Sequence, residues 1–283
     1  MVDCQQLIHI VFLGMVQGFT EFLPISSSAH LLLANRFLAL PYYGKTFDLV
    51  LHLGSLGAVL YFFRADLKGV SAGMISFLRS KGRKWPENAE ERWGAAVLVA
   101  MLPTSCIGFL VDPWVEKYLQ SPWLMAGLLA GFGLLLGWSD YQAARREISS
   151  GSGYSLAAVN SWNWKKSFWL GIAQALAFIP GVSRSGVCLT VTRMWGLNRV
   201  QSVRLSMLMS IPVIAGAVCV KAFSGAIADL TIPWPLVCTG VASAALCSWC
   251  SLKMLEKAGQ VLQLAACYRL VLALIIVIML GLG

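Results

Sequence analysis

Residues Gln17–Leu31 read QGFTEFLPISSSAHL, and residues 173–186 read AQALAFIPGVSRSG. In each stretch a proline and a group of serines interrupt an apolar run, at Pro24–Ser28 in the first and at Pro180–Ser185 in the second. Irregular backbone at membrane depth is tolerated only where protein or a water-filled cavity surrounds it. Each stretch therefore predicts a re-entrant helical hairpin, in which two short helices enter the membrane and return to the same side.

The composition of the whole chain predicts a protein that crosses a membrane several times. Of its 283 residues, 58% are hydrophobic and 12% are charged, and the mean hydropathy is +0.70. An average soluble chain is roughly 25% charged, so this chain cannot cover the surface of a water-soluble globule. The net charge of +9 comes from basic residues in short connectors, as membrane orientation requires. The sequence has no basic stripe with interleaved aromatic residues, so nucleic acid is not an expected partner.

Ten apolar segments alternate with short connectors along the chain. Six are long enough to cross a hydrocarbon core of about 30 Å, and the other four form the two interrupted pairs. The sequence therefore predicts an all-α polytopic membrane protein, a single integral membrane domain over 1–283 with about six spanning helices plus two re-entrant helical hairpins. The segments are 7–20, 28–43, 47–63, 94–111, 123–139, 168–179, 185–196, 205–221, 234–251 and 261–282.

The basic connectors predict how the chain is oriented. Connector 64–92 is rich in Lys and Arg, which marks it as cytoplasmic. Because each span changes the side of the membrane, connector 112–122 then lies outside, connector 140–166 lies inside, and the C-terminus lies outside. The two hairpins then enter from opposite sides, and three spans follow each of them. This is an inverted repeat, with repeat one at about 1–140 and repeat two at about 160–283.

The two interrupted stretches also resemble each other in sequence. Gln17 precedes Ser26 by nine residues, and Gln174 precedes Ser183 by nine, which gives an offset of about 157 residues. Inverted repeats of this kind are common in transporters, and their interrupted helices mark the binding site near the midplane. We therefore predict that the two stretches form one site. The alternative is that proline and serine merely kink two helices.

The two stretches together carry side chains that suit a phosphate group. Arginine is a planar, permanently charged fork for phosphate oxygens, and serine clusters begin helices whose free N–H groups favour an anion. Ser27 lies one helical turn before His30, which permits a hydroxyl nucleophile activated by a base. Glu21 could orient His30, act as the base itself, or hold a divalent cation on a diphosphate. The candidates are Gln17, Glu21, Ser26, Ser27, Ser28 and His30 in the first tip (residues 17–30), and Gln174, Ser183, Arg184, Ser185 and Thr190 in the second tip (residues 174–190).

Each of these residues also has a plainer explanation. A serine run before an apolar helix is most often an N-cap, and Arg184 could be a structural partner of Glu21. Polar groups are costly inside a bilayer, however, so their combination on facing tips favours an anion site. We expect Ser27, His30 or Glu21 to lie within about 6 Å of Arg184, close enough to share one phosphate. Two further histidines, His9 and His52, are predicted to be structural, and Asp48, Asn198 and Arg199 are predicted to fix helix ends or to line an entrance.

The two motifs resemble the signature motifs of the undecaprenyl-diphosphate phosphatases, also called the bacitracin-resistance protein family. Stretches 47–64, 196–212 and 268–270 are similar to further parts of that family, so the resemblance covers nearly the whole chain. It implies a phosphatase of the bacterial inner membrane that hydrolyses the C55 lipid carrier diphosphate to the monophosphate plus inorganic phosphate. It also implies a role in recycling the carrier for cell-wall polymers, bacitracin resistance, a site open to the periplasm and stimulation by a divalent cation.

The resemblance assigns roles by motif. It implies Ser27 as the nucleophile, Glu21 and His30 in acid–base or metal roles, and a divalent cation such as Mg²⁺ or Ca²⁺ with Glu21 as the candidate ligand. The first motif's leading position is often Glu in the family and is a glutamine here. Glutamine cannot serve as a base or a charged ligand, so these roles are assigned to Glu21. The phosphate would be held by Arg184 with Ser183, and Ser185, Ser26 and Gln17 complete the predicted phosphate site.

A polyprenyl-phosphate flippase is the main alternative. It would need the same anion site, and the inverted repeat also suits a transporter. Ser27, His30 and Glu21 favour hydrolysis, because a pure carrier needs no nucleophile. A structural scaffold would not place Glu, His and Arg at interrupted helices.

Overall fold

The computed structural model describes residues 4–37, 42–150, 153–228, 230, 232–257 and 261–282. All regular structure in these ranges is helical, so the predicted all-α fold is confirmed. Part of predicted segment 28–43, at 38–41, lies outside the described residues. The helices are α1 (Cys4–Phe22), α2 (Ser27–Phe37), α3 (Lys45–Phe62), α4 (Asp66–Arg79), α5 (Ala89–Tyr118), α6 (Pro122–Ser150), α7 (Gly153–Asn160), α8 (Trp164–Ala175), η1 (Leu176–Phe178), α9 (Arg184–Met194), α10 (Arg199–Phe223), α11 (Trp234–Lys257) and α12 (Val261–Leu282).

Five of the described helices, α5, α6, α10, α11 and α12, are long and apolar enough to cross a membrane. Helices α3 and α4 qualify as a sixth span when taken together, although the chain bends by 94° between them. Large apolar side chains such as Leu102, Phe109 and Leu110 of α5 are exposed on the outside of the protein, where hydrocarbon can cover them. The predicted polytopic membrane protein with about six spanning helices is confirmed.

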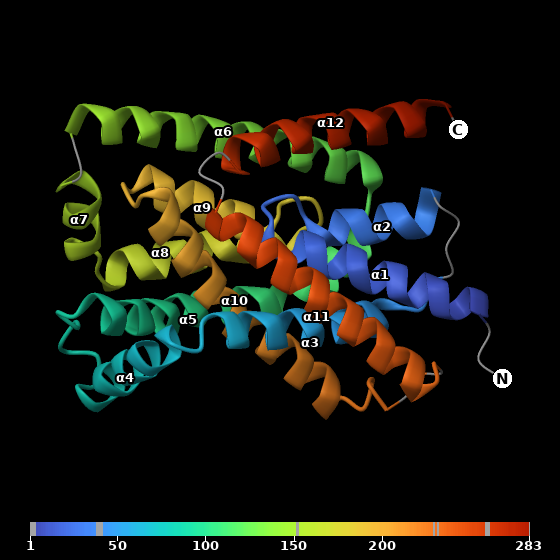
Figure 1. The fold of residues 1–283 in the computed structure, drawn as a ribbon, viewed down its shortest axis with the longest axis horizontal. Helices are drawn as coiled ribbons and strands as arrows, with labels where there is room; N and C mark the ends of the chain where they lie inside the picture. Colours follow the sequence, from blue (N-terminus) through green and yellow to red (C-terminus); the bar gives the residue numbers. More distant parts are fainter. Residues whose placement is uncertain are drawn as a thin grey trace.

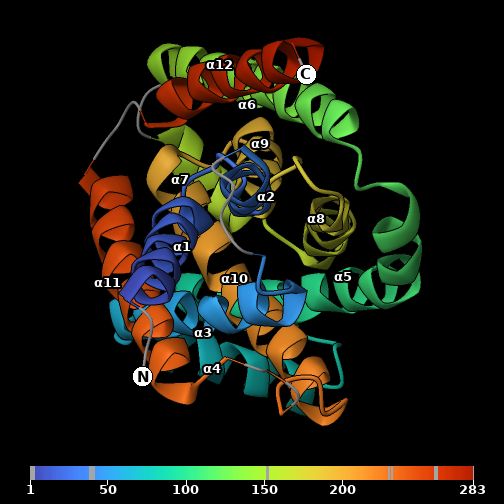
Figure 2. The same ribbon diagram turned by 90° about the vertical axis from the view of Figure 1, so that its right-hand side faces the viewer.

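The two predicted hairpins are the pairs α1–α2 and α8–α9. Helix α1 enters from the end of the molecule where both labelled termini lie, α8 enters from the opposite end, and the two turns lie near the middle (Figure 1). Along the long axis, α2, α8 and α9 are central, and α3, α5, α6, α11 and α12 lie around them (Figure 2). Protein therefore encloses the irregular backbone of both turns, as a broken helix at membrane depth requires.

Two helices lie in stretches that the sequence analysis treated only as connectors. Helix α4 occupies part of connector 64–92, and α7 lies within connector 140–166. Of the α4 residues only Val70 and Gly73 are buried, so the helix lacks the continuous apolar pattern by which the spans were recognised. These connectors therefore contain helices that the sequence analysis did not predict.

Helix α11 packs tightly against α1 and α3 through small residues. A Cβ atom added at Gly18 of α1 would lie 2.1 Å from the carbonyl oxygen of Ala244, and one added at Gly54 of α3 would lie 2.2 Å from that of Val241. Both distances are far inside van der Waals contact. Small residues at such positions let backbones approach closely, which is how helices associate in lipid. This packing fixes α1 and α3, which both carry residues of the candidate site.

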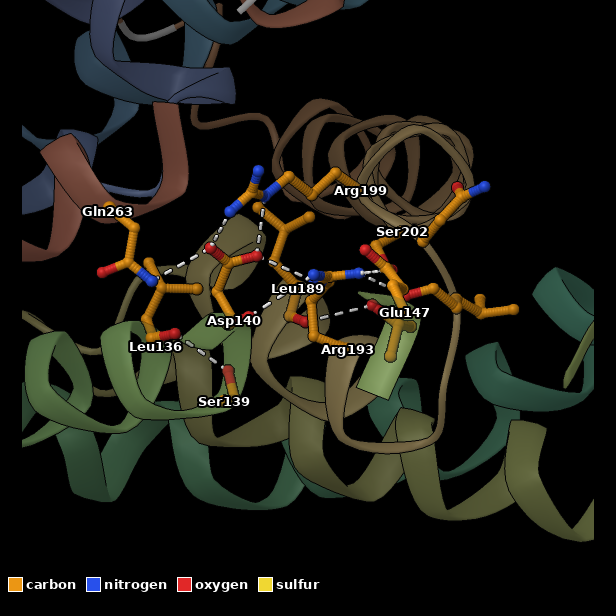
Figure 3. Close-up of polar contacts among 12 residues, drawn as sticks. Leu136, Ser139, Asp140, Glu147, Leu189, Arg193, Arg199, Ser202 and Gln263 are labelled. Carbon is orange, nitrogen blue, oxygen red and sulfur yellow. Dashed lines mark hydrogen bonds and ion pairs between the residues drawn. The ribbon is translucent and has the colours of Figure 1, made fainter. Parts of the chain in front are cut away.

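A buried ion cluster ties α9 to three other helices (Figure 3). Asp140 of α6 is completely buried and accepts hydrogen bonds from Arg193 of α9 at 2.9 Å, from Arg199 of α10 at 2.7 and 2.9 Å, and from Gln263 of α12 at 3.0 Å. A buried charge is stable only when it is paired and hydrogen-bonded. The cluster therefore anchors the end of α9 that lies away from the turn.

The ends of α10 follow the sequence analysis. The side chain of Asn198 accepts a hydrogen bond from the backbone N–H of Gln201 at 2.8 Å and so caps the helix. Arg199, the first residue of α10, forms the ion pair with Asp140 at 2.7 Å. The prediction that Asn198 fixes a helix end is confirmed, while Arg199 links α10 to α6.

Candidate active site

The two turns share an unusual backbone conformation. Ser26 and Ser183 have φ values of 72° and 69°, in the left-handed region that residues other than glycine rarely adopt. Each serine lies close to the hydroxyl of the serine two positions on: Ser26 Oγ is 3.1 Å from Ser28 Oγ, and Ser183 Oγ is 3.3 Å from Ser185 Oγ. The offset of 157 residues found in the sequence therefore relates two turns of the same local geometry.

The first and second tips meet at Glu21 and Arg184. Glu21 Oε1 accepts a hydrogen bond from Arg184 Nη2 at 2.7 Å, and both side chains are largely buried. The expected approach of the tips to within about 6 Å is confirmed. Because Arg184 is the first residue of α9, its positive charge adds to that of the helix N-terminus.

The hydroxyl of Ser27 is hydrogen-bonded to Glu21, and not to His30 as the one-turn spacing had suggested. Ser27 Oγ donates a hydrogen bond to Glu21 Oε2 at 2.7 Å, and Gln17 Nε2 donates to the same oxygen at 3.0 Å. Gln17 Oε1 is buried and has no hydrogen-bond partner among the described residues. The carboxylate of Glu21 is thus the acceptor that faces the Ser27 hydroxyl.

His30 is held on the side of α2 that faces α12. Its Nδ1 lies 2.8 Å from the carbonyl oxygen of Ser26, and its Nε2 lies 2.7 Å from the hydroxyl of Tyr268. The two rings are stacked, with centroids 5.6 Å apart. Because a carbonyl oxygen only accepts, Nδ1 carries the hydrogen of a neutral ring and Nε2 accepts from Tyr268. Both nitrogens of His30 are therefore engaged away from Ser27.

His52 lines the pocket beside Glu21, although the sequence analysis set it apart from the two tips. Its Nε2 lies 3.4 Å from Glu21 Oε2, and its Nδ1 lies 2.8 Å from the backbone oxygen of Asp48. The sequence motifs did not point to His52 because this residue is in α3, far in sequence from both of them. One signal could have found it, since an ionisable residue within an apolar span is by default a candidate for function.

The remaining residues of the second tip divide between the pocket and the protein interior. Ser183 Oγ accepts from the backbone N–H of Gly186 at 3.2 Å and so caps α9. Ser185 Oγ donates to the carbonyl oxygen of Leu23 at 3.1 Å, which joins the two turns. Thr190 donates to the Gly186 carbonyl within its own helix at 2.8 Å. Ser185 and Thr190 are buried.

Arg269 of α12 is a second link between the turns that the sequence analysis missed. Its side chain is completely buried. The guanidinium donates to the carbonyl oxygens of Pro24 at 3.3 Å in one turn, of Gly181 and Val182 at 2.9 and 3.0 Å in the other, and of Leu129 at 3.1 Å. The carbonyls of Pro24, Gly181 and Val182 lie where the helices are broken, so they lack helical partners and need a donor from elsewhere.

A pocket of about 190 Å³ opens between the tips. Glu21, His52 and Arg184 are the titratable groups that line it. Its walls combine hydroxyl and amide groups with apolar residues of α3, η1 and α10, as expected of a site for an amphiphilic ligand. The lining residues are Glu21, Ser26, Ser27, Ser28, Leu49, His52, Thr104, Gln174, Ala177, Phe178, Ser183, Arg184, Val213, Ile214 and Ala217.

Among the described residues, no group of three or more His, Cys, Asp or Glu side chains could hold a metal ion by itself. The pocket offers one carboxylate, Glu21, with serine hydroxyls beside it. Mg²⁺ is commonly held by one or two carboxylates together with phosphate oxygens of a substrate. This donor set therefore fits a cation that is bound jointly with a phosphate ligand.

The fold and the pocket define a polytopic membrane protein with a polar-lined pocket between two interrupted helices. The chain matches the family described as "Bacitracin resistance protein BacA" over residues 10–275 and belongs to that family.

Three curated relatives are named as undecaprenyl-diphosphatases. The chain is 36% identical over 277 residues to "Undecaprenyl-diphosphatase 2" of Stutzerimonas stutzeri, which covers 96% of this chain and 98% of the relative. It is 34% identical over 275 residues to "Undecaprenyl-diphosphatase" of Chromohalobacter salexigens, with the same coverage. It is 40% identical over 214 residues to "Undecaprenyl-diphosphatase" of Rubrobacter xylanophilus, covering 75% of this chain and 74% of the relative.

Proposed function

We propose that this protein hydrolyses undecaprenyl diphosphate to undecaprenyl phosphate and inorganic phosphate. The observation that carries the proposal is the arrangement around Glu21, in which one carboxylate oxygen accepts from Ser27 and the other from Arg184, each at 2.7 Å. A hydroxyl, a base and a phosphate-binding cation thus lie at one point of the pocket. The names of the relatives supply the substrate.

In this mechanism Ser27 Oγ attacks the terminal phosphorus of the diphosphate. A bond forms between Oγ and phosphorus, the bridging P–O bond breaks, and its electron pair stays on the lipid phosphate. Glu21 takes the hydroxyl proton, because its Oε2 already accepts the hydrogen bond from Ser27. Water then attacks the phosphorus of the phosphoserine, the P–Oγ bond breaks, and the proton held by Glu21 returns to Oγ as inorganic phosphate leaves. Arg184 holds the phosphate oxygens in this step and offsets their charge.

Ser26 and Ser183 would bind phosphate oxygens. Ser26 and Ser183 line the pocket, and their left-handed backbones begin the helices whose free N–H groups favour an anion. Ser185 and Gln17 would act indirectly, because Ser185 is bonded to the first turn and Gln17 to Glu21. His30 would position α2 through its bonds to Ser26 and Tyr268.

A divalent cation, Mg²⁺ or Ca²⁺, would bind between Glu21 and the diphosphate. Its chemistry would be to neutralise the charge of the phosphate oxygens. The cation site is supported by the single carboxylate of the pocket. A cation on one carboxylate would need oxygens of the substrate to complete its coordination shell.

We place the protein in the bacterial inner membrane with the pocket open to the periplasm or exterior. The basic connectors support a cytoplasmic position for residues 64–92. Hydrolysis there would recycle the lipid carrier for cell-wall synthesis and so give bacitracin resistance. A flippase is the less favoured alternative, because Ser27 and Glu21 form a nucleophile–base pair that transport does not need.

The test is phosphate release by the purified protein in detergent, with undecaprenyl diphosphate and Mg²⁺ or Ca²⁺. We expect stoichiometric formation of lipid monophosphate and inorganic phosphate. Transfer of labelled lipid phosphate across vesicles without any phosphate release would favour the flippase instead. Loss of turnover with a chelator, and its recovery with added cation, tests the cation.

A further inference from the structure

A second cavity lies where α3 bends into α4, outside the candidate active site. Its volume is about 310 Å³, and no residue that lines it also lines the pocket between the tips. Its walls come from the end of α3, the start of α4, the first turns of α10, the end of α11 and the start of α12. The proposed reaction gives this cavity no role.

The position of α4 indicates the depth at which this cavity lies. The chain bends by 94° between α3 and α4, so α4 lies across the membrane normal when α3 lies along it. Helix α4 is at the end of the molecule opposite the two labelled termini (Figure 1). Ile75 and Leu78 are exposed on it, and so are Lys68 and Arg79. Exposed apolar residues with basic residues beside them are typical of a helix in the membrane interface, so the cavity at its first turn lies at headgroup depth.

The cavity presents guanidinium N–H groups that need an acceptor. Arg204 is paired with Asp66 through Nη2, but its Nε is buried and has no hydrogen-bond partner among the described residues. Arg199 donates to Asp140 through Nε and Nη2, which leaves Nη1 for another acceptor. A buried donor without an acceptor is destabilising. Both arginines line the cavity, where the oxygens of an anionic group could accept from them.

The rest of the lining suits an amphiphile that also carries a cation. Asp66 and Glu256 line the cavity together with the two arginines, so two cationic and two anionic side chains cancel in formal charge. A ligand with negative charge alone would meet these carboxylates. A phosphate, an ammonium and a hydrocarbon chain in one molecule match all the surfaces of the cavity. The apolar walls include Phe62, Phe63, Val200, Val203, Leu252 and Leu255.

We propose that this cavity binds the headgroup of a zwitterionic phospholipid with a primary ammonium, as in phosphatidylethanolamine. The phosphate accepts from Arg204 Nε and Arg199 Nη1, and the ammonium donates to the carboxylate of Glu256. Val200 is 71% exposed, so the acyl chains leave past it into the surrounding hydrocarbon. The bound lipid joins the bend between α3 and α4 to α10. The inference does not depend on the proposed function.

Binding to the purified full-length protein tests the identity of the lipid. The protein is delipidated in a neutral detergent and titrated with phosphatidylethanolamine, phosphatidylcholine or phosphatidylglycerol, and native mass spectrometry measures the bound lipid. Phosphatidylcholine has no N–H donor, and phosphatidylglycerol has no ammonium. We therefore expect phosphatidylethanolamine to bind about tenfold more tightly than either. Equal binding of the three lipids would overturn the inference, and so would tighter binding of phosphatidylglycerol, which would indicate an anionic lipid.

Matched valine replacements on α10 test the position of the lipid. Val200→Trp fills the mouth of the cavity, whereas Val220→Trp adds the same bulk at an exposed position of α10 that does not line the cavity. We expect Val200→Trp to weaken phosphatidylethanolamine binding about tenfold and Val220→Trp to leave it unchanged. Glu256→Gln should bind phosphatidylethanolamine and phosphatidylcholine equally. Equal phosphatidylethanolamine affinity of the two tryptophan variants would overturn the site.

A measurement on wild type is independent of how these variants fold. Phosphatidylethanolamine with a free amine and a photoreactive group close to the glycerol is crosslinked to the protein, and the adducts are mapped by peptide mass spectrometry. We expect adducts in 62–66, 199–207 and 252–256 that an excess of unlabelled phosphatidylethanolamine removes. Adducts confined to other parts of the chain would contradict the inference.

Discussion

Arg184 Nη2 lies 2.7 Å from Glu21 Oε1, although 163 residues separate them in sequence. This ion pair joins two turns that enter the molecule from opposite ends (Figure 1). It is largely buried, and a buried pair in apolar surroundings is costly unless further groups compensate. The serines, His52 and the helix ends around it are those groups, and a phosphate ligand would add to them.

The first prediction concerns Arg184→Lys. Lysine keeps the charge but loses the planar fork that can hold Glu21 and a phosphate oxygen together. We expect kcat/KM to fall about a hundredfold, with the protein still eluting as a folded species. Steady-state kinetics of phosphate release measure this effect. Near-normal kinetics would show that Arg184 supplies charge alone.

Arg269→Gln should separate the two turns. The guanidinium donates hydrogen bonds to four backbone carbonyl oxygens, and the side chain of glutamine cannot reach them all. Each buried carbonyl left without a donor costs about 1–3 kcal/mol, so we expect a lower melting temperature together with a lower kcat. A variant with unchanged melting and turnover would mean that the turns hold their shape without Arg269.

Gly18→Ala tests the contact between α1 and α11, where an added Cβ would meet the Ala244 carbonyl at 2.1 Å. We expect a clear drop in melting temperature, because the clash is with backbone. Gly57→Ala in α3 is the matched control, since nothing lies within 4 Å of its added Cβ and alanine favours a helix over glycine by about 1 kcal/mol. Equal melting temperatures of the two variants would rule out the tight packing.

Much of the fold could be predicted because lipid imposes strict rules on sequence. Long apolar runs identify the spans, and the interrupted motifs locate both hairpins. Helices α4 and α7 could not be found in this way, because neither is a long apolar run.

The candidate site was predictable where its residues belong to the two motifs. Glu21, Ser27 and Arg184 meet as expected. His52 and Arg269 were missed because they come from α3 and α12, and their roles depend on how those helices pack. The spacing of Ser27 and His30 was also misleading. Residues three apart share one face of a helix, but the ring of His30 is fixed by Tyr268 from another helix.

The central claim is that Ser27 is the nucleophile, and Ser27→Ala tests it most directly. The measurement is the initial rate of phosphate release from undecaprenyl diphosphate by wild type, Ser27→Ala and Ser28→Ala, each checked for folding. We expect Ser27→Ala to lose about a thousandfold or more of kcat, because no attacking oxygen remains. Ser28→Ala should lose less than about tenfold, since Ser28 contributes a bond to Ser26. Normal turnover by Ser27→Ala would contradict the account.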